Sequence, residues 1–271
     1  KCGAETIPTI LKKYGADAMR LYYANSGSPF ADVVFSEEAV LKYKSRLTRI
    51  FDLFEKIHKM PSGKKHSMDP WLLSKFNTRL DIMIQEMEQF SFKGYTDESY
   101  FNIYKDISWY ISRAGSNSRL LKDLLKKWSL TLSVFTPHIA EDLFELFDGK
   151  TLAANTSFPQ VNKVDINSEI ESTEDFILKI REDIIAVSRL AKIGDLSKIT
   201  LFVAEEWKYA FMSTLKKQLK KTMNVGEIIP LLMKKPSLKK HGKIISKMIP
   251  RFVKNPKFLP ELVRSQVDEY N

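Results

Sequence analysis

Apolar side chains recur every three or four residues along most of this chain, and this spacing limits its fold more than any other feature. The first long stripe comprises Val40, Tyr43, Leu47, Ile50, Phe54 and Ile57. A repeat near 3.6 residues places such side chains on one face of an α-helix. Similar stripes follow at about 73–87, 100–111 and 121–132. Long amphipathic helices with short joints predict an up-and-down helical bundle, so the predicted fold class is mainly α.

Capping residues and loop composition set the predicted helix limits. Ser36 precedes the first long stripe and is expected to cap its helix. Thr96, followed by two acidic residues, is expected to begin a later one. Residues 61–67 combine proline, glycine, serine and lysine, a composition that predicts a mobile connection. Only 10 glycines among 271 residues argue against a turn-rich β protein.

A polar, irregular stretch at residues 151–167 separates two parts of the chain. We therefore predict three regions: a connecting segment at 1–35, the bundle at 36–158, and a C-terminal basic region at 159–271. Polar stretches of this kind join domains more often than they form part of a core.

The C-terminal region combines a predicted helix with a predicted strand. The helix, at about 173–192, is expected to turn four apolar side chains inward: Phe176, Ile180, Ile184 and Val187. Residues 199–203 (Ile-Thr-Leu-Phe-Val) form the one good strand pattern of the sequence. Because a single strand cannot pair its backbone groups, a partner strand is expected beyond Asn271. We therefore predict a smaller α/β or helical basic domain that is truncated.

Charge is distributed unevenly along the chain. The net charge is +10, yet residues 1–207 carry 28 basic and 29 acidic side chains, whereas residues 208–271 carry 15 and 4. A basic segment of this strength favours a phosphate-rich partner over an ordinary solvated surface. The stripe from Trp207 to Leu219 could instead bind a membrane, but apolar residues at this spacing are more often core. We expect no membrane partner.

Residues that carry common active-site chemistry are sparse. The single cysteine, Cys2, excludes an internal disulfide and indicates a reducing, cytoplasmic compartment. Four scattered histidines and one cysteine do not make a zinc site, and no phosphate-binding glycine loop occurs. His138 follows a proline at a helix start, where it touches a ligand or, as we favour, bonds a nearby helix end. We assign no catalytic, cofactor or metal-binding residue.

Three short segments resemble landmarks of the class I aminoacyl-tRNA synthetases whose anticodon-binding domain is a helical bundle. Residues 14–20 (Tyr-Gly-Ala-Asp-Ala-Met-Arg) resemble the segment that follows the family's Lys-Met-Ser-Lys-Ser signature. Residues 71–77 (Trp-Leu-Leu-Ser-Lys-Phe-Asn) resemble the start of the bundle, and residues 135–144 (Phe-Thr-Pro-His-Ile-Ala-Glu-Asp-Leu-Phe) resemble its last long helix. The order and spacing of the three segments agree with the family.

Further signals favour the leucyl enzyme of archaeal and eukaryotic-cytosolic type. Residues 31–40, 203–208 and 240–243 are similar to its linker and to two later elements. The isoleucyl, valyl or methionyl enzyme is an alternative within the family, and a helical interaction scaffold or a peripheral membrane protein is one outside it. Two features depart from the family pattern. Residues 2–5 lack the usual Gly-Asn, and Phe158 stands where tryptophan is common.

The resemblance implies that this chain is the C-terminal, tRNA-binding part of a leucine–tRNA ligase. The parent would activate leucine with ATP and Mg²⁺ and transfer it to tRNA(Leu), using catalytic and editing domains that precede Lys1. The fragment alone would be inactive and would need no cofactor. Basic side chains would position the tRNA by its phosphates. Nine candidates for tRNA contact are Arg113, Arg119, Lys122, Lys126, Lys234, Lys235, Lys239, Lys240 and Lys243.

Overall fold

The computed structural model describes residues 7–27, 35–147, 150–194, 198–201 and 204–255, and these contain helices and no strand. The chain divides into two compact units, Lys1–Glu171 and Ser172–Asn271. Cys2 and linker residues 31–34 lie outside the described part. The predicted division at 35/36 and 158/159 stays a prediction.

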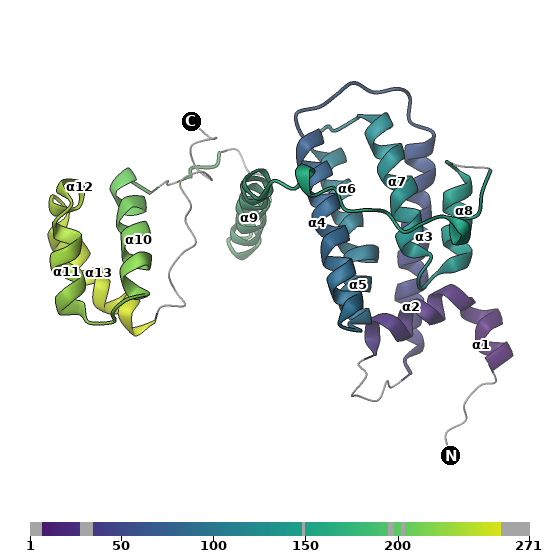
Figure 1. Cartoon of the computed structure of the whole chain (residues 1–271), viewed down its shortest axis with the longest axis horizontal. Coiled ribbons are helices and arrows are strands. Elements are labelled where there is room, and N and C mark those ends of the chain that lie inside the picture. Colours follow the sequence, from purple (N-terminus) through teal and green to yellow (C-terminus); the bar gives the residue numbers. More distant parts are fainter. Residues whose placement is uncertain (1–6, 28–34, 148–149, 195–197, 202–203, 256–271) are drawn as a thin grey trace, which may run out of the picture. The chain divides into compact units, whose positions relative to one another are not determined.

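The first unit is a helical bundle, as the apolar stripes predict (Figure 1). Its long helices lie side by side and alternate in direction, so that their connections gather at two ends. Its elements are α1 Ile7–Tyr14, α2 Ala16–Ser26, α3 Glu37–His58, α4 Asp69–Glu88, α5 Phe92–Thr96, the π-helix η1 Asp97–Asn102, α6 Ile103–Ser112, α7 Ser118–Leu132, α8 Pro137–Glu145, and the 3₁₀ turns η2 Ala153–Asn155 and η3 Lys163–Asp165.

Large aromatic side chains fill the core of the bundle. Trp128 is fully buried, its ring centroid lies 5.1 Å from that of Phe54, and its indole Nε1 donates to the Ser99 carbonyl oxygen at 2.6 Å. Tyr100 is equally buried, and its hydroxyl donates to the Leu132 carbonyl oxygen at 2.9 Å. Burial raises the pKa of the Tyr100 phenol, so this group is a neutral structural donor. The predicted inward face of α7 is therefore confirmed.

The structure confirms one predicted helix start and corrects another. Ser36 caps α3, because its hydroxyl accepts from the Ala39 amide at 3.3 Å. Thr96 begins no helix: the helix opens at Phe92 and continues through η1 into α6. The Thr96 hydroxyl bonds back to the Phe92 carbonyl oxygen at 2.9 Å and accepts from Asn25 Nδ2 at 2.8 Å. A threonine hydroxyl can cap a helix start or bond to a carbonyl one turn earlier inside a helix. At Thr96 the second arrangement occurs, and the bond from Asn25 supports it.

The loop between α3 and α4, which the sequence predicts to be mobile, is held by hydrogen bonds. The Gly63 amide donates to Ser118 Oγ at 3.1 Å, and the His66 amide donates to Asp69 Oδ2 at 3.0 Å. The Met68 amide donates to His66 Nδ1 at 3.2 Å. These bonds fix both halves of the loop against the bundle.

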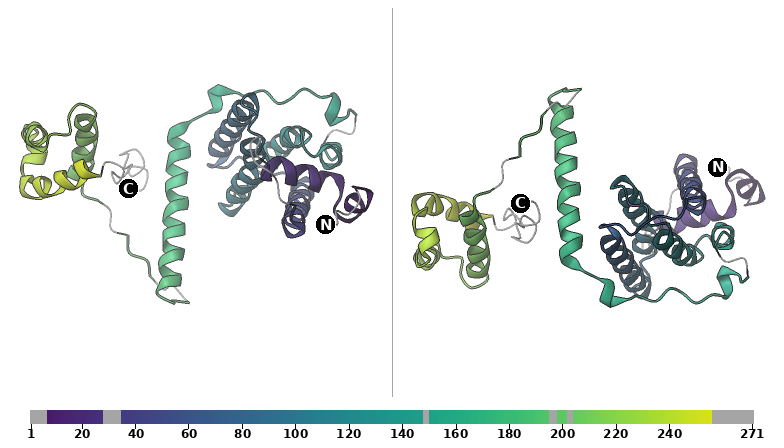
Figure 2. Two further views of the ribbon diagram at one scale, coloured as in Figure 1. Left: turned by 90° about the horizontal axis from the view of Figure 1, so that it is seen from below. Right: turned by 90° about the horizontal axis from the view of Figure 1, so that it is seen from above.

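The second unit has its own core, built by helices α10 Glu206–Leu219, α11 Val225–Met233, α12 Pro236–Lys239 and α13 Gly242–Lys254. Figure 2 shows α10–α13 from two further sides. Phe211, Leu215, Ile228, Leu232 and Ile245 are fully buried in that core. The stripe that begins at Trp207 is therefore core rather than a membrane face. No helix in the described ranges is both long and apolar enough to cross a bilayer.

Two predictions for the second region are wrong. Residues 199–201 form no strand, and residues 202–203 of the predicted strand lie outside the described part. The described residues contain no β-strand that could pair with residues 199–201, so their backbone groups make no sheet hydrogen bonds there. Val187, expected to face inward from α9 (Ser168–Leu190), is 63% exposed. Among the described residues, α10–α13 complete the core without α9.

Candidate nucleic-acid interface

Three of the four candidate cations of the bundle share one face of α7. Arg119, Lys122 and Lys126 are spaced by three and four residues, which places them on one side of a helix. Arg119 is exposed, whereas Lys122 is half-buried and its Nζ donates to the Met60 carbonyl oxygen at 3.5 Å. Lys126 Nζ lies 5.5 Å from the centroid of a phenylalanine ring. Only part of this stripe is thus directed to solvent.

Arg113 is the exposed C-cap of α6, at the loop that leads into α7. A cation at a helix C-terminus is stabilised by the helix dipole, so this position suits arginine even without a ligand.

The five candidate lysines of the second unit surround the short helix α12. All are exposed: Lys234, Lys235, Lys239, Lys240 and Lys243. Lys235 Nζ donates to Thr214 Oγ1 at 2.9 Å, which anchors it to α10. These amines thus reach solvent from the end of α11, both ends of α12 and the first turn of α13.

Helix α13 carries a cationic stripe that our sequence reasoning missed beyond Lys243. Lys243, Lys247, Arg251 and Lys254 are all exposed. Their spacing of four, four and three residues places them on one side of the helix, while Ile245 and Ile249 fill the opposite side. Residues 206–254 carry 13 basic and two acidic side chains. The repeat was visible in the sequence, but a count of lysines without helix phase does not reveal it.

A stacked pair positions this basic surface. The rings of Trp207 and His241 lie 4.1 Å apart with an interplanar angle of 6°. Trp207 Nε1 donates to Glu205 Oε2 at 2.7 Å. Residues 204–208 and 240–243, which belong to two segments that separately resemble the leucyl enzyme, therefore meet in space. The stack fixes the turn between α12 and α13 against α10.

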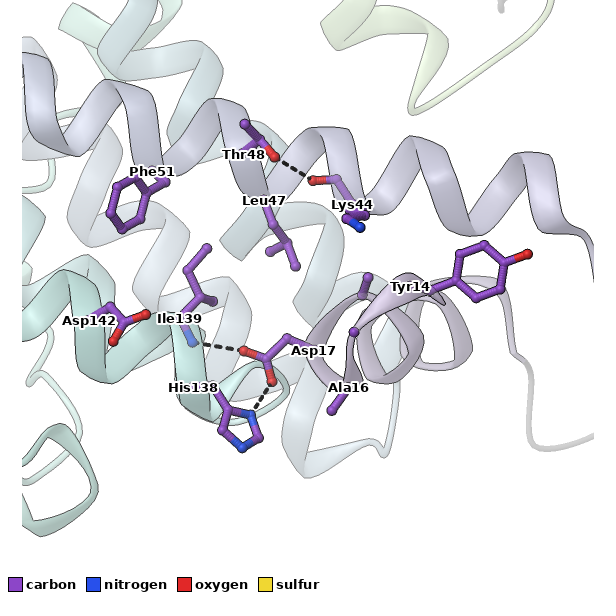
Figure 3. A pocket seen from close by; sticks show the side chains of 12 residues that line it. Tyr14, Ala16, Asp17, Lys44, Leu47, Thr48, Phe51, His138, Ile139 and Asp142 are labelled. Atoms are coloured by element: carbon purple, nitrogen blue, oxygen red, sulfur yellow. Dashed lines mark hydrogen bonds and ion pairs between the residues drawn. The ribbon is translucent and has the colours of Figure 1, made fainter. Parts of the chain in front are cut away.

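The first and third family-like segments also meet, around the carboxylate of Asp17 (Figure 3). Asp17 Oδ2 accepts from the Ile139 amide at 2.8 Å, and Asp17 Oδ1 lies 2.8 Å from His138 Nδ1. Thr136, the N-cap of α8, makes no side-chain cap bond, so Asp17 supplies that oxygen from α2. Arg20 Nε donates to the Phe135 carbonyl oxygen at 2.7 Å. His138 thus bonds at a helix end, as we favoured.

An open cavity of about 590 Å³ lies beside this joint, between α2, α3 and α8. Its polar lining includes Asp17, Lys44, Thr48, His138 and Asp142 (Figure 3). Asp17 is already bonded twice, and Lys44 Nζ donates to the Lys13 carbonyl oxygen at 3.4 Å. Within the described residues, no three His, Cys, Asp or Glu side chains are grouped to hold a metal ion. Asp17, His138 and Lys44 in this lining thus make hydrogen bonds within the bundle.

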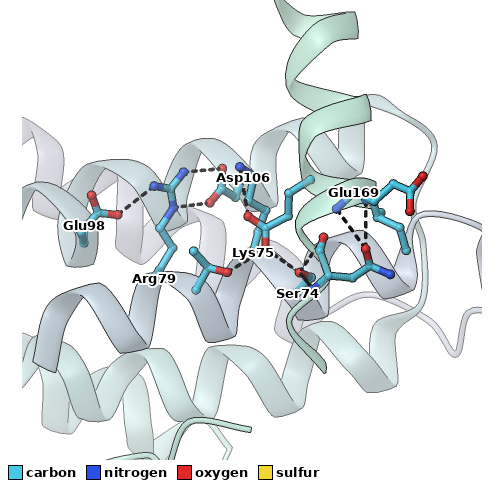
Figure 4. Close-up of polar contacts among 10 residues, drawn as sticks. Ser74, Lys75, Arg79, Glu98, Asp106 and Glu169 are labelled. Atoms are coloured by element: carbon cyan, nitrogen blue, oxygen red, sulfur yellow. Dashed lines mark hydrogen bonds and ion pairs between the residues drawn. The ribbon is translucent and has the colours of Figure 1, made fainter. Parts of the chain in front are cut away.

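The second family-like segment, residues 71–77, binds the stretch 162–167 that precedes α9 (Figure 4). Asn77 Oδ1 accepts from the Asn162 amide at 2.7 Å, and Ser74 Oγ accepts from the Asn167 amide at 2.8 Å. Ser74 also donates to the buried Glu171 carboxylate at 2.5 Å. The serine and asparagine of this motif are therefore buried, and they hold residues 162–171 against α4.

A buried ion-pair network lies on the next turn of α4. Arg79 Nε donates to Asp106 Oδ2 and Arg79 Nη1 donates to Glu98 Oε2, each at 2.9 Å (Figure 4). Burial is the largest single effect and lowers the pKa of Arg79, but the hydrogen bonds and negative charges of Asp106 and Glu98 together outweigh it and raise that pKa. This arginine joins three helices and is not available to a phosphate.

A family model and several curated proteins are similar to this chain. Residues 69–200 match the family model of the anticodon-binding domain of tRNA ligase. The leucine–tRNA ligase of Methanococcus vannielii is 31% identical over 244 residues, covering 89% of this chain and 25% of the relative. That of Pyrococcus horikoshii is 25% identical over 258 residues, covering 92% and 26%. The chain therefore spans about a quarter of the length of these curated relatives.

A solved structure shares the fold. It is the AgnB2 LeuRS of Agrobacterium radiobacter K84, in a ternary complex with tRNA and LeuAMS. The TM-score is 0.53 at 19% identity, and the match covers 60% of this chain and 22% of that one.

Proposed function

Because this chain carries the anticodon-binding domain of the tRNA ligases and is related to the leucine–tRNA ligases, we propose that it is the tRNA-binding part of an enzyme that joins leucine to tRNA(Leu). The observation that supports RNA binding most strongly is the charge of residues 206–254, with 13 basic and two acidic side chains on a folded unit. A phosphate backbone is the partner that such a surface fits best.

In the proposed complex, the cations of this chain contact phosphates of the tRNA and do not read its bases. The cations of α13 and the lysines around α12 lie on helices that are already folded. Binding therefore does not have to order the backbone that carries them, which lowers its entropic cost. Phosphate contacts set register and orientation without carrying sequence information. Selectivity among tRNAs then follows from the shape of the folded RNA.

Activation of leucine belongs to the remainder of the parent protein. In that step the leucine carboxylate would attack the α-phosphorus of ATP, displacing pyrophosphate and leaving leucyl adenylate. Transfer of the leucyl group to a ribose hydroxyl of the tRNA would then release AMP. Among the described residues, no three His, Cys, Asp or Glu side chains are grouped to hold a metal ion. Polar side chains of the family-like segments make hydrogen bonds within the bundle. The cytoplasm is the compartment where this reaction is proposed to occur.

Binding of transcribed tRNA(Leu), tRNA(Ile) and tRNA(Val) to the whole chain tests this function. We expect log affinity to fall linearly with log salt, and tRNA(Leu) to bind more tightly than the other two. Absence of binding, or binding that salt leaves unchanged, would contradict RNA contact. Tighter binding of tRNA(Ile) or tRNA(Val) would transfer the assignment to that enzyme. Leucine-dependent pyrophosphate exchange by this chain alone would refute its purely binding role.

A further inference from the structure

A second cavity of the bundle, of about 680 Å³, opens between α2, α3 and the π-helix η1. Small-molecule sites in proteins occupy roughly 300–1,000 Å³, so this volume is of the right size for one. Its apolar lining includes Ala39 and Leu41 on α3 and Phe101 on η1. π-Helical turns are rare and are frequently found at functional sites. The size and the lining of this cavity therefore suit a small ligand with an apolar part.

The guanidinium of Arg46 lines this cavity and is held by aromatic rings. Its Cζ lies 4.7 Å from the ring centroid of Phe101 and 5.1 Å from that of Tyr104. Contact with aromatic faces orients a guanidinium without using its N–H donors. Arg46 is half-buried, and no hydrogen bond or ion pair joins it to another described residue. Its N–H groups are therefore oriented but not used within the described part of the chain.

Arg49 adds a second guanidinium to the same cavity. It is exposed and, like Arg46, makes no hydrogen bond or ion pair with any residue that the structure describes. Residues three apart on a helix are neighbours, so two positive charges lie side by side. Burial and, after it, the charge of Arg49 lower the pKa of the Arg46 guanidinium. An anion bound between the two groups would relieve this repulsion.

The carboxylates that line the cavity do not neutralise these arginines, because both are bonded to other side chains. Glu38 Oε1 lies 2.8 Å from Lys42 Nζ. Asp97 Oδ2 lies 2.7 Å from Lys93 Nζ, and Asp97 Oδ1 accepts from Asn25 Nδ2 at 2.8 Å. Within the described lining, the two arginines are therefore the charged groups that lack an opposite charge.

A phosphomonoester suits this pair of guanidiniums better than a carboxylate does. A phosphate group on a single ester bond carries a charge of roughly −1.5 to −2 at neutral pH and three strong acceptor oxygens. Arginine binds such groups through paired, charge-assisted hydrogen bonds. One phosphate can thus bond to both guanidiniums, whereas a carboxylate brings a single negative charge and two oxygens. The apolar lining would then contact a ring attached to the phosphate.

We propose that the cavity between α2, α3 and η1 binds a small aromatic phosphomonoester. Arg46 and Arg49 donate hydrogen bonds to its phosphate, and Leu41 and Phe101 contact its ring. The site holds its ligand and carries out no chemical step. This inference does not rest on the proposed tRNA binding, and neither arginine is among the candidates for tRNA contact.

The test is calorimetric titration of the whole chain with phenyl phosphate. Arg46→Gln and Arg49→Gln should each weaken binding by roughly tenfold or more, because each removes hydrogen bonds to a charged group. Arg119→Gln is the matched control, since it removes the same charge from an exposed position on α7 outside the cavity. Arg46→Lys keeps the charge but lacks the planar fork, so it should also bind more weakly than the unsubstituted chain.

Two further probes test the chemical class of the ligand. Inorganic phosphate lacks the ring and benzoate lacks the phosphate, so both should bind more weakly than phenyl phosphate. Equal affinity for either one would overturn the proposed class. Absence of phenyl phosphate binding, or equal binding by Arg49→Gln and Arg119→Gln, would overturn the site itself.

Binding of tRNA(Leu) by the same variants separates this site from an RNA surface. Unchanged tRNA affinity in Arg49→Gln would support a separate site. A loss as large as that for phenyl phosphate would place the arginine on an RNA surface and overturn the proposal. Because Arg49 is exposed, Arg49→Gln remains informative even if Arg46→Gln does not fold, and melting curves show which variants are folded.

Discussion

The bundle and the basic unit use their charged side chains in opposite ways. In the bundle, cations meet carboxylates: Arg79 contacts Glu98 and Asp106 at 2.9 Å, and Lys75 Nζ lies 3.5 Å from Glu171. Residues 204–255 hold 13 basic and three acidic side chains, and Lys208 Nζ lies 4.0 Å from Glu205 Oε1. The bundle thus pairs several of its cations with its own carboxylates, whereas the basic unit has few carboxylates for its many cations.

This difference separates the residues that mark the family from those proposed to bind RNA. Asp17, Ser74, Asn77 and His138 belong to the family-like segments, and each is bonded within the bundle. Most of the cations proposed to bind phosphates lie outside the family-like segments; Lys240 and Lys243, in segment 240–243, are the exceptions. The family-like segments thus contain residues that hold helices of the bundle together, whereas the proposed tRNA binding depends on the pattern of surface charge. The predictions below test that separation, beginning with the largest expected effect.

Removal of the central indole should damage the bundle most. Trp128→Ala deletes a fully buried ring together with its bond to the Ser99 carbonyl oxygen. We expect a loss of about 3–5 kcal/mol in the free energy of unfolding, measured by urea denaturation. Phe90→Ala is the control, because this aromatic ring is 71% exposed. Equal effects of the two substitutions would contradict the assigned core.

Loss of the Asp17 carboxylate should cost less, and its effect should stay within the bundle. Asp17→Ala leaves the Ile139 amide without its acceptor, for which we expect a destabilisation of about 1–3 kcal/mol. At temperatures where the variant is folded, the salt dependence of tRNA binding should match that of the unsubstituted chain. A changed salt slope would mean that this family-like segment contacts RNA itself.

Stability in acid should depend on Asp69. Burial favours the protonated form of this carboxyl, but hydrogen bonds from Tyr110 and Asn117 outweigh that effect and hold its pKa below the usual value. A lowered folded-state pKa gives stability that is present at neutral pH and is lost as pH falls through that pKa. Asp69→Asn should therefore reduce the acid-side slope of melting temperature against pH. An unchanged slope would remove Asp69 as its source.

Much of the bundle could be predicted from the sequence, because a stripe such as Val40 to Ile57 depends only on helix geometry. The joints could not be: Asp17 and Ile139 are 122 residues apart, and no local rule pairs them. Thr96 was misassigned because its tertiary bond to Asn25 outweighs its capping preference. Of the candidate site, a count of charges predicts the basic character of residues 208–271, whereas the alignment of Lys243, Lys247, Arg251 and Lys254 on one face depends on the phase of α13.

The central claim is that binding depends on unpaired cations of the basic unit, and the salt dependence of tRNA(Leu) binding tests it most directly. One variant carries Lys243→Ala, Lys247→Ala, Arg251→Ala and Lys254→Ala. Its control loses the same charge from exposed bundle positions, through Lys12→Ala, Lys42→Ala, Lys93→Ala and Lys105→Ala. Both should keep the melting curve of the unsubstituted chain, since surface substitutions change stability little.

The account predicts that the slope of log affinity against log salt falls by roughly 3–4 units in the α13 variant, at about 0.7–0.9 per lost phosphate contact. The control should keep its slope, and the α13 effect should be similar for several tRNAs, because phosphate contacts do not read bases. Equal slopes in the two folded variants would contradict the account, because the α13 cations would then be ordinary solvated charges.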